Sequence, residues 1–190
     1  GVKGARILSR DELEKKEPNL SKDIKNGIWI TSGGIIASYE LAVAFAEEGI
    51  ITGGKVYLEF NSIKITKKGE IFTLKSQNNE TIETKCIINA CGNGVNDINN
   101  LLKAENYRVV YRRGEYYLLD KMTAGFVNHP IFPLPTEKSK GVLVAPTVHG
   151  NILVGPTSIV DDYSLKTTTG GLNYVKKEAG KKVKVKVLRA

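Results

Sequence analysis

The first candidate for a ligand site is a run of small residues at the end of an apolar segment. The apolar segment 86–90 ends in Asn89 and Ala90, and Cys91 and Gly92 follow directly. Side chains this small let a ligand approach the backbone, as the edge of a cofactor site requires. A tight turn without any ligand has the same composition, so these residues leave both interpretations open.

The glycines that follow resemble part of a dinucleotide-binding loop. Gly92 and Gly94 match the first two glycines of G-x-G-x-x-G, but Asp97 stands where the third glycine belongs. An acidic residue that ends a strand about 20 residues further on is also missing. The sequence contains no Gly-Lys-Ser or Gly-Lys-Thr of a phosphate loop and no Gly-x-Ser-x-Gly of a serine hydrolase. These patterns argue against all three classes of site.

The sequence offers no metal site and no disulfide framework. His129 and His149 lie in different segments, and neither has the spacing to Cys86 or Cys91 that a zinc site needs. The N-terminus lacks the hydrophobic stretch of a secretory signal, and no apolar run approaches the roughly 20 residues of a membrane span. We therefore predict an intracellular, cytoplasmic protein with no metal and no transmembrane segment.

Composition and charge favour a folded domain over a nucleic-acid binder. The 190 residues are 41% hydrophobic and 25% charged, which excludes a disordered chain. The formal net charge is +8, but residues 176–189 hold seven basic residues and one acidic residue, and so carry six of the eight charges. Such a basic terminal segment is usually a solvated or edge element. We therefore predict no nucleic-acid partner.

Helical patterns flank the region of the candidate site. Ser9, followed by acidic and then basic residues, predicts a short exposed helix over 9–17 that Pro18 ends. Ser38 is the predicted N-cap of a second helix that runs to Gly49. Most of its positions are apolar, so we expect this second helix to be mostly buried.

A strand period of two dominates the remaining chain. The predicted strands fall within residues 56–60, 63–65, 71–74, 81–90, 109–111, 116–119, 142–147, 151–156 and 182–187, and a further helix is predicted over 171–177. Segment 86–90 is apolar on both sides and is expected inside a sheet. Segments 142–147 and 151–156 form a hairpin candidate. The predicted fold class is α+β, with a large mixed sheet that is mainly antiparallel.

Four segments, taken in order, resemble parts of flavoproteins of the D-amino-acid oxidase and glycine oxidase superfamily. They are residues 33–41 before a helix, the Asn-Ala-Cys-Gly end of 87–92, the Arg-Arg-Gly-Glu-Tyr of 112–116, and 145–157 with its Gly-Pro-Thr end. The resemblance is nearest to the glycerol-3-phosphate dehydrogenase and L-2-hydroxyglutarate oxidase branch. It implies part of an FAD-binding α/β domain and a substrate domain built on an antiparallel sheet.

The resemblance also implies cofactor contacts and a reaction. It places Ala90, Cys91 and Gly92 against FAD, and Ser62 near the adenosine half of FAD. The implied reaction is oxidation of a 2-hydroxy acid or glycerol 3-phosphate by hydride transfer to flavin N5. The implied partners are therefore a small anionic substrate and an unidentified electron acceptor.

On the substrate side the resemblance implies four further residues: Arg113, Tyr116, Lys140 and His149. The guanidinium of Arg113 has the shape to hold a carboxylate or phosphate at two points. His149 is the candidate base for the hydroxyl proton, because histidine titrates near neutral pH.

The chain departs from the family pattern at both ends. It begins Gly1-Val2-Lys3 without Met, while the family's G-x-G-x-x-G loop belongs upstream and its glycine-rich flavin segment belongs downstream. Those segments supply a helix N-terminus and backbone amides to the pyrophosphate. We therefore expect an inactive internal fragment that binds FAD weakly or not at all. The expected organisation is a substrate-domain entry and helix at 1–54, a partial FAD-binding domain at 55–105, the substrate-domain sheet at 106–175 and a basic tail at 176–190.

Two other functions stay open. One is a non-enzymatic β-sheet module whose basic C-terminal segment binds an acidic partner or nucleic acid. The other is an amino-acid or amine oxidase, since the resembling superfamily also oxidises amino acids. The Arg-Gly-Glu-Tyr and Gly-Pro-Thr segments favour the enzyme acting on a CH-OH group over the amine oxidase.

Overall fold

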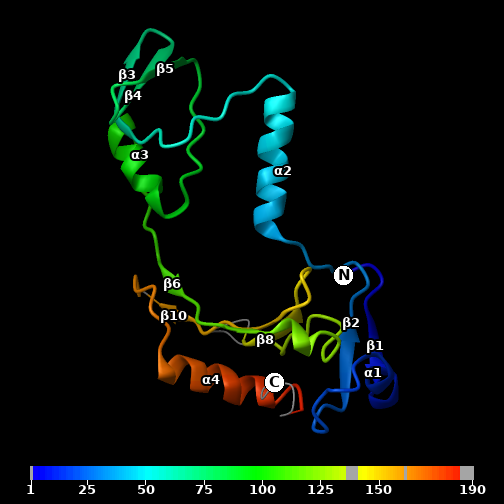
Figure 1. Cartoon of the computed structure of the whole chain (residues 1–190). Helices are drawn as coiled ribbons and strands as arrows, with labels where there is room; N and C mark the ends of the chain where they lie inside the picture. The colour runs from blue at the N-terminus through cyan, green and yellow to red at the C-terminus, as the bar shows by residue number, and fades with distance from the viewer. Residues whose placement is uncertain (1, 136–140, 161, 185–190) are drawn as a thin grey trace. The chain divides into compact units, whose positions relative to one another are not determined.

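The chain folds into two compact units. The computed structural model describes residues 2–135, 141–160 and 162–184. One unit comprises Gly1–Ala42 together with Tyr111–Ala190, and the second unit comprises Val43–Val110. Figure 1 shows the helices and strands along the chain. The first boundary falls inside a helix, so this helix contributes residues to both units.

A capped helix between two paired strands opens the first unit. β1 (Arg6–Ser9) pairs antiparallel with β2 (Asn26–Trp29), and α1 (Arg10–Lys16) lies between them in the chain. The hydroxyl of Ser9 accepts a hydrogen bond from the backbone N–H of Glu12, and the Glu12 carboxylate accepts one from the N–H of Ser9. This capping box fixes the start of α1. The short helix predicted over 9–17 is confirmed.

The core of the first unit lies between a three-stranded antiparallel sheet and a helix. The sheet has the order β7 (Tyr117–Leu119), β9 (Ile152–Gly155), β8 (Leu143–Pro146), and α4 (Thr169–Gly180) contacts β9. The buried core side chains are Val127, Val142, Val144, Ile152, Val154, Val175, Ala179 and Val183. Their spacing of two along each strand turns one sheet face inward. The predicted hairpin and the predicted C-terminal helix are both confirmed.

Short elements complete the first unit. β6 (Arg112–Arg113) pairs antiparallel with β10 (Ile159–Val160), and the 3-10 turn η2 spans Lys121–Thr123. An isolated bridge joins Leu20 to Val183, in the segment predicted as a strand over 182–187. Residues 185–187 of that segment lie outside the described part of the chain.

A β-meander and a helix form most of the second unit. β3 (Ser62–Lys68), β4 (Ile71–Ser76) and β5 (Thr81–Thr84) pair antiparallel in chain order. The 3-10 turn η1 (Gly92–Gly94) leads into α3 (Val95–Leu102), which contacts β3. The predicted meander is confirmed.

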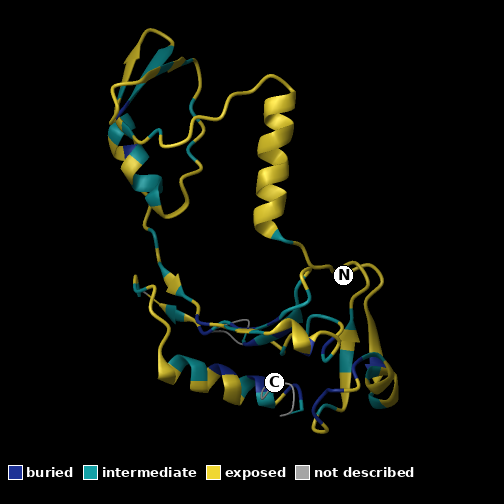
Figure 2. Ribbon diagram, in the orientation of Figure 1, coloured by how far each residue is buried: buried dark blue, intermediate teal, exposed yellow. Residues whose placement is uncertain are grey.

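The helix that spans the two units, α2 (Ser38–Ile51), is confirmed as a helix, but the prediction of its burial is wrong. None of its residues is buried, and Figure 2 shows it exposed along nearly its whole length. An apolar helix becomes buried only where another element covers it. The described residues do not provide such a cover.

The fold class is α+β and the strand pairs are antiparallel, as predicted. The prediction of one large sheet is wrong. The described residues form two sheets of two strands and two sheets of three. Segments 56–60, 86–90 and 109–111 are not strands. Segment 86–90 could enter a sheet only with hydrogen-bonding neighbours, and no described strand pairs with it. Its Ile88 side chain is 87% exposed.

The capping box predicts a pH dependence of stability. Hydrogen bonds from the backbone N–H and hydroxyl of Ser9 lower the pKa of Glu12 below the usual 4.5. Because the pKa is depressed in the folded helix, the stabilisation is present above the unfolded-state pKa and is lost as the pH falls through the folded-state pKa. We expect the free energy of unfolding, measured with urea at a series of pH values, to fall more steeply below pH 4.5 in the wild type than in Glu12→Gln, which lacks the titrating carboxyl group. Equal slopes would contradict this assignment.

Candidate functional site

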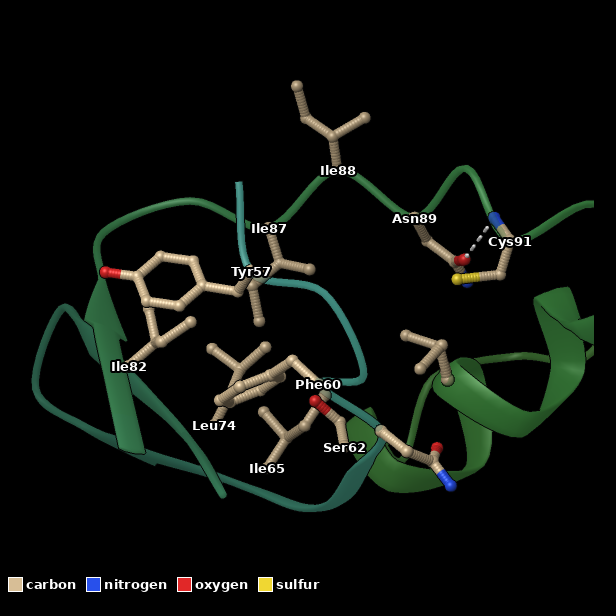
Figure 3. A pocket seen from close by; sticks show the side chains of 12 residues that line it. Tyr57, Phe60, Ser62, Ile65, Leu74, Ile82, Ile87, Ile88, Asn89 and Cys91 are labelled. Carbon is tan, nitrogen blue, oxygen red and sulfur yellow. Dashed lines mark hydrogen bonds between the residues drawn. The ribbon is translucent and has the colours of Figure 1, made fainter. Parts of the chain in front are cut away.

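The second unit contains a pocket of about 420 Å³, a volume typical of small-molecule sites. Aliphatic side chains from β3, β4 and β5 line it together with the rings of Tyr57 and Phe60, whose centroids are 6.2 Å apart. Figure 3 shows Phe60 and Leu74 pointing toward one another, while Ile88 points away. Ser62, Asn89 and Cys91 add polar groups to the lining. The pocket is therefore mainly apolar and aromatic, with a few hydrogen-bonding groups.

Asn89 holds one wall of this pocket in place. Its amide NH₂ donates to the carbonyl of Val95 at 2.8 Å and to Oδ1 of Asn99 at 2.9 Å, so it binds the start and the middle of α3. Its Oδ1 accepts from the backbone N–H of Cys91 at 3.3 Å. Gly92 follows with a φ of +53°, which favours glycine. The Asn-Ala-Cys-Gly segment is thus a fixed turn against α3.

Two of the four predicted cofactor residues line the pocket. Ser62 and Cys91 belong to the lining, whereas Ala90 and Gly92 occupy the adjoining turn. An apolar, aromatic pocket with hydroxyl, amide and thiol groups at its edge fits a flat heterocycle such as an end of FAD. No lysine or arginine is among the residues that line this pocket in the described chain, so the lining offers no cation to a pyrophosphate. The residues present therefore fit an uncharged part of FAD.

In the first unit, His149 is joined to the beginning of α2. His149 lies in the turn between β8 and β9, and its Nε2 is 2.6 Å from the hydroxyl oxygen of Tyr39 and 3.2 Å from Oε1 of Glu40. The two rings stack with centroids 5.9 Å apart. Desolvation, with the neighbouring Glu40 carboxylate, raises the pKa of Tyr39, so its hydroxyl stays protonated at neutral pH. The cluster can therefore hold and exchange a proton around Nε2.

Sequence reasoning missed Tyr39 and Glu40. Both were visible only as the first turn of a predicted helix, and 110 positions separate Tyr39 from His149 in the chain. No spacing rule connects a helix start to a hairpin turn so far away. Their acid, hydroxyl and imidazole groups come together only through the fold.

Arg113, a predicted substrate residue, is engaged by acidic side chains. Its guanidinium forms ion pairs with Glu115 at 3.1 Å and Asp162 at 2.9 Å, and it also donates to the carbonyl of Lys166. The side chain of Arg113 is 12% exposed and that of Glu115 is 2% exposed. Any substrate anion at this guanidinium would have to compete with two carboxylates already in place.

Glu115 connects this ion pair to α4. Its carboxylate accepts from the backbone N–H of Thr168 at 2.8 Å and from the Thr168 hydroxyl. Thr168 is itself the N-cap of α4 and accepts from the N–H of Gly171. A side chain at Gly171 would collide with the Glu115 carboxylate, which explains the glycine at this place in a helix.

The other predicted substrate residues are not gathered in one place. Tyr116 is 43% exposed and packs its ring against Gly155, at the end of β9. His149 precedes the start of β9, so the length of this strand separates the two. Lys140 lies outside the described residues. The four substrate assignments stay predictions.

The described part of the chain contains neither a cluster of metal-binding side chains nor a membrane-spanning helix. Within residues 2–135, 141–160 and 162–184, no group of three or more His, Cys, Asp or Glu side chains could hold a metal ion. Over the same ranges, no helix is long and apolar enough to cross a membrane.

Comparison with known proteins places this geometry in a family. A family model described as "FAD dependent oxidoreductase" (DAO) matches residues 1–185. A glycerol 3-phosphate dehydrogenase of Caloramator mitchellensis is 37% identical over 186 residues, which cover 97% of this chain and 38% of the relative.

Solved structures share the fold. A structure of dithionite-reduced L-α-glycerophosphate oxidase from Mycoplasma pneumoniae with FAD bound superposes with a TM-score of 0.76 at 26% identity, covering 96% of this chain and 49% of that one. Glycine oxidase from Geobacillus kaustophilus gives a TM-score of 0.79 at 18% identity, covering 98% and 48%. The chain thus spans half or less of the length of each of these proteins.

The buried carboxylate predicts a large loss of stability on truncation. Glu115→Ala leaves the Arg113 charge with one partner fewer in a largely buried site and removes the acceptor for Thr168, so we expect a cost of about 3 kcal/mol. The matched control is Glu14→Ala, which breaks an exposed pair with Arg10 at 3.7 Å and should cost less than about 1 kcal/mol. Urea unfolding followed by circular dichroism measures both, and equal small losses would contradict the role of Glu115.

Proposed function

We propose that this chain, which belongs to the DAO family of FAD dependent oxidoreductases, is part of an enzyme that oxidises the secondary alcohol of glycerol 3-phosphate or a 2-hydroxy acid. The observation that carries the proposal is the 37% identity with a glycerol 3-phosphate dehydrogenase over 97% of this chain. The related L-2-hydroxyglutarate dehydrogenase of Escherichia coli, 26% identical over 80% of this chain, widens the substrate class to 2-hydroxy acids.

Family membership favours this function over a non-enzymatic binding module. An amino-acid oxidase stays the second candidate, because glycine oxidases share the fold. Fold likeness at 18% identity does not carry a substrate, whereas the more similar glycerol 3-phosphate relative does favour one.

The pocket of the second unit is the proposed place for one end of FAD. Ser62 and Cys91 would contact the cofactor from the pocket lining, and Ala90 and Gly92 from the adjoining turn. When bound, FAD supplies the oxidising power by accepting a hydride from the carbon that carries the hydroxyl. The chain's own task is to fix this turn through Asn89 and to keep the pocket apolar.

His149 is the proposed base for the substrate hydroxyl. With the proton on Nε2, the ring donates to the hydroxyl oxygen of Tyr39 at 2.6 Å, and Tyr39 donates its own proton to Oε1 of Glu40 at 3.4 Å. Nδ1 is then left as the nitrogen that accepts the hydroxyl proton. Nδ1 forms no hydrogen bond to any residue of the described chain. The side chain is 42% exposed, so a small substrate can reach it.

Glu40 and Tyr39 are proposed to position this imidazole. The carboxylate of Glu40, 3.2 Å from Nε2, stabilises the imidazolium that forms when Nδ1 takes a proton. The hydroxyl of Tyr39 and the stacked ring fix the orientation. Tyr116 and Lys140 stay proposed contacts for the anionic group of the substrate. Arg113, already paired with two carboxylates, is proposed to hold the segment between β6 and β7 that carries Tyr116.

The isolated chain should bind FAD weakly or not at all. Its pocket lining offers apolar and neutral polar groups but no cation for the pyrophosphate in the described residues. We expect the purified 190-residue protein, mixed with FAD and desalted, to lose the flavin absorbance bands. Retention of these bands would contradict the prediction.

The role of His149 can be tested in a chimeric protein, which we call the Caloramator chimera. In it, this chain replaces the matched segment of the Caloramator relative. We expect His149→Asn to lower kcat for glycerol 3-phosphate by about 10²-fold to 10⁴-fold, because it removes a general base. Tyr39→Phe should lower kcat less and shift its pH profile, since it removes the hydroxyl that accepts from Nε2 and donates to Glu40.

His129→Asn is the matched control. His129 pairs with Glu17 at 2.7 Å in the first unit and has the same 42% exposure as His149, but it takes no part in the proposed reaction. An unchanged kcat and pH profile in His149→Asn would remove His149 from the role of base. An equal effect of both histidine substitutions would show that the loss is structural.

A further inference from the structure

The three-stranded sheet of the second unit has an apolar face and a basic face. Ile65, Leu74 and Ile82 lie side by side in register and line the pocket. Neighbouring residues of a strand point to opposite sides of a sheet, so Lys64 and Lys75 lie on the face away from the pocket. This assignment follows from the pairing of β3, β4 and β5 alone, and all three strands belong to the second unit.

The residues of the face away from the pocket, called the basic face below, are mostly lysines and threonines. Across β3 and β4 they form three pairs, Lys64–Lys75, Thr66–Thr73 and Lys68–Ile71, and β5 adds Thr81 beside Lys75 and Glu83 beside Thr73. Among the described residues, none of the three lysines forms an ion pair, and neither does Glu83. The basic face therefore carries an excess of positive charge that the described chain does not neutralise.

The pairing of two lysines is the feature that needs an explanation. Lys64 and Lys75 lie directly opposite each other, where Cβ atoms are about 4.5–5.5 Å apart and like charges destabilise a sheet. Lysines are common on edge strands, because they prevent pairing with another chain. That explains Lys64 on β3 but not Lys75, since β4 is the central strand of this sheet. Negative charge from outside the sheet would relieve the repulsion between them.

The spacing of the lysines indicates an extended anionic partner rather than a small anion. Lys64 and Lys68 are four residues apart along β3, which is about 13 Å, so a single phosphate group cannot contact both. One exposed ion pair contributes little to affinity, and useful binding needs several at once. The hydroxyls of Thr66 and Thr73 lie between the lysines and can donate hydrogen bonds to carboxylates.

The composition of the basic face disfavours a membrane surface as the partner. Clusters that bind anionic lipids hold roughly four to eight basic residues, and stable anchoring needs an apolar contact in addition. The basic face offers three lysines and one apolar side chain, Ile71. A protein that presents several carboxylates fits it better.

We propose that the basic face of β3, β4 and β5 is a docking surface for a protein with an acidic surface. Carboxylates of this partner pair with Lys64, Lys68 and Lys75, and complementary charge sets the orientation of the complex. Such an interface forms fast and weakens as salt is added. The inference does not depend on the proposed substrate or on FAD binding.

The first test measures the repulsion between the two lysines in the 190-residue chain. In low salt, Lys75→Gln should lower the equilibrium constant of urea unfolding by about twofold to fivefold, because it removes one of two like charges. Added salt should shrink this difference, since it screens the charges. The matched control is Lys67→Gln on the pocket face, where Nζ of Lys67 lies 4.8 Å from the ring centroid of Phe72. It should give no gain in stability.

A Lys75→Gln protein that is no more stable than wild type in low salt would overturn the inference. The lysine pair would then cause no strain, and no anionic partner would be needed to relieve it.

The second test maps the docking surface on the Caloramator chimera, with poly-L-glutamate as the acidic probe. Each lysine is acetylated with and without the probe, and mass spectrometry gives the rate at each position. Saturating probe should slow the acetylation of Lys64, Lys68 and Lys75 by about tenfold. Lys22 and Lys25, two exposed lysines of the first unit, are the matched controls and should keep their rates. Because each lysine is measured separately, binding of the probe to the basic tail does not affect the result.

Three outcomes of this mapping would overturn the inference. One is equal protection of the three lysines and the two controls, and another is slow acetylation of the three lysines without any probe, which would mean that the protein itself covers the basic face. The third is protection by vesicles of phosphatidylglycerol but not by poly-L-glutamate, which would identify a membrane surface as the partner.

Discussion

The buried carboxylate of Glu115 is the interaction on which the first unit depends. It pairs with Arg113 and accepts hydrogen bonds from Thr168, so it joins the strand region after β6 to the N-terminus of α4. Its backbone also exchanges hydrogen bonds with Thr157, beyond the end of β9. Because a buried carboxylate is tolerated only when it is fully partnered, these three segments must keep one arrangement. That arrangement sets where Tyr116 and the hairpin with His149 lie.

The second unit differs from the first. Hydrogen bonds fix the wall of its pocket, but many of its apolar side chains are exposed. The side chain of Asn89 holds the turn that follows it against α3 and so fixes one wall of the pocket. The same unit exposes the apolar residues of α2 and Ile88. A wall of this kind fits one part of FAD.

Local sequence patterns predicted most of the helices and strands correctly. The features that these patterns missed depend on contacts with other parts of the fold. The cap at Ser9, the meander and the hairpin before and after His149 follow from short-range spacing and were predicted correctly. Segment 86–90 and the burial of α2 were wrong, because both require neighbours that the described residues do not supply. The contact of Tyr39 and Glu40 with His149 could not be predicted, since it joins a helix start to a distant turn. The pairing of Arg113 with Asp162, far away in the chain, was hidden for the same reason.

We propose that this chain provides the substrate side of an FAD-dependent enzyme that acts on a secondary alcohol. Anaerobic addition of substrate to the FAD-loaded Caloramator chimera tests it most directly, because loss of the oxidised flavin absorbance reports hydride transfer without any electron acceptor. The account predicts rapid loss of absorbance with glycerol 3-phosphate or L-2-hydroxyglutarate and none with glycine or L-proline. Loss of absorbance with the amino acids alone would contradict it.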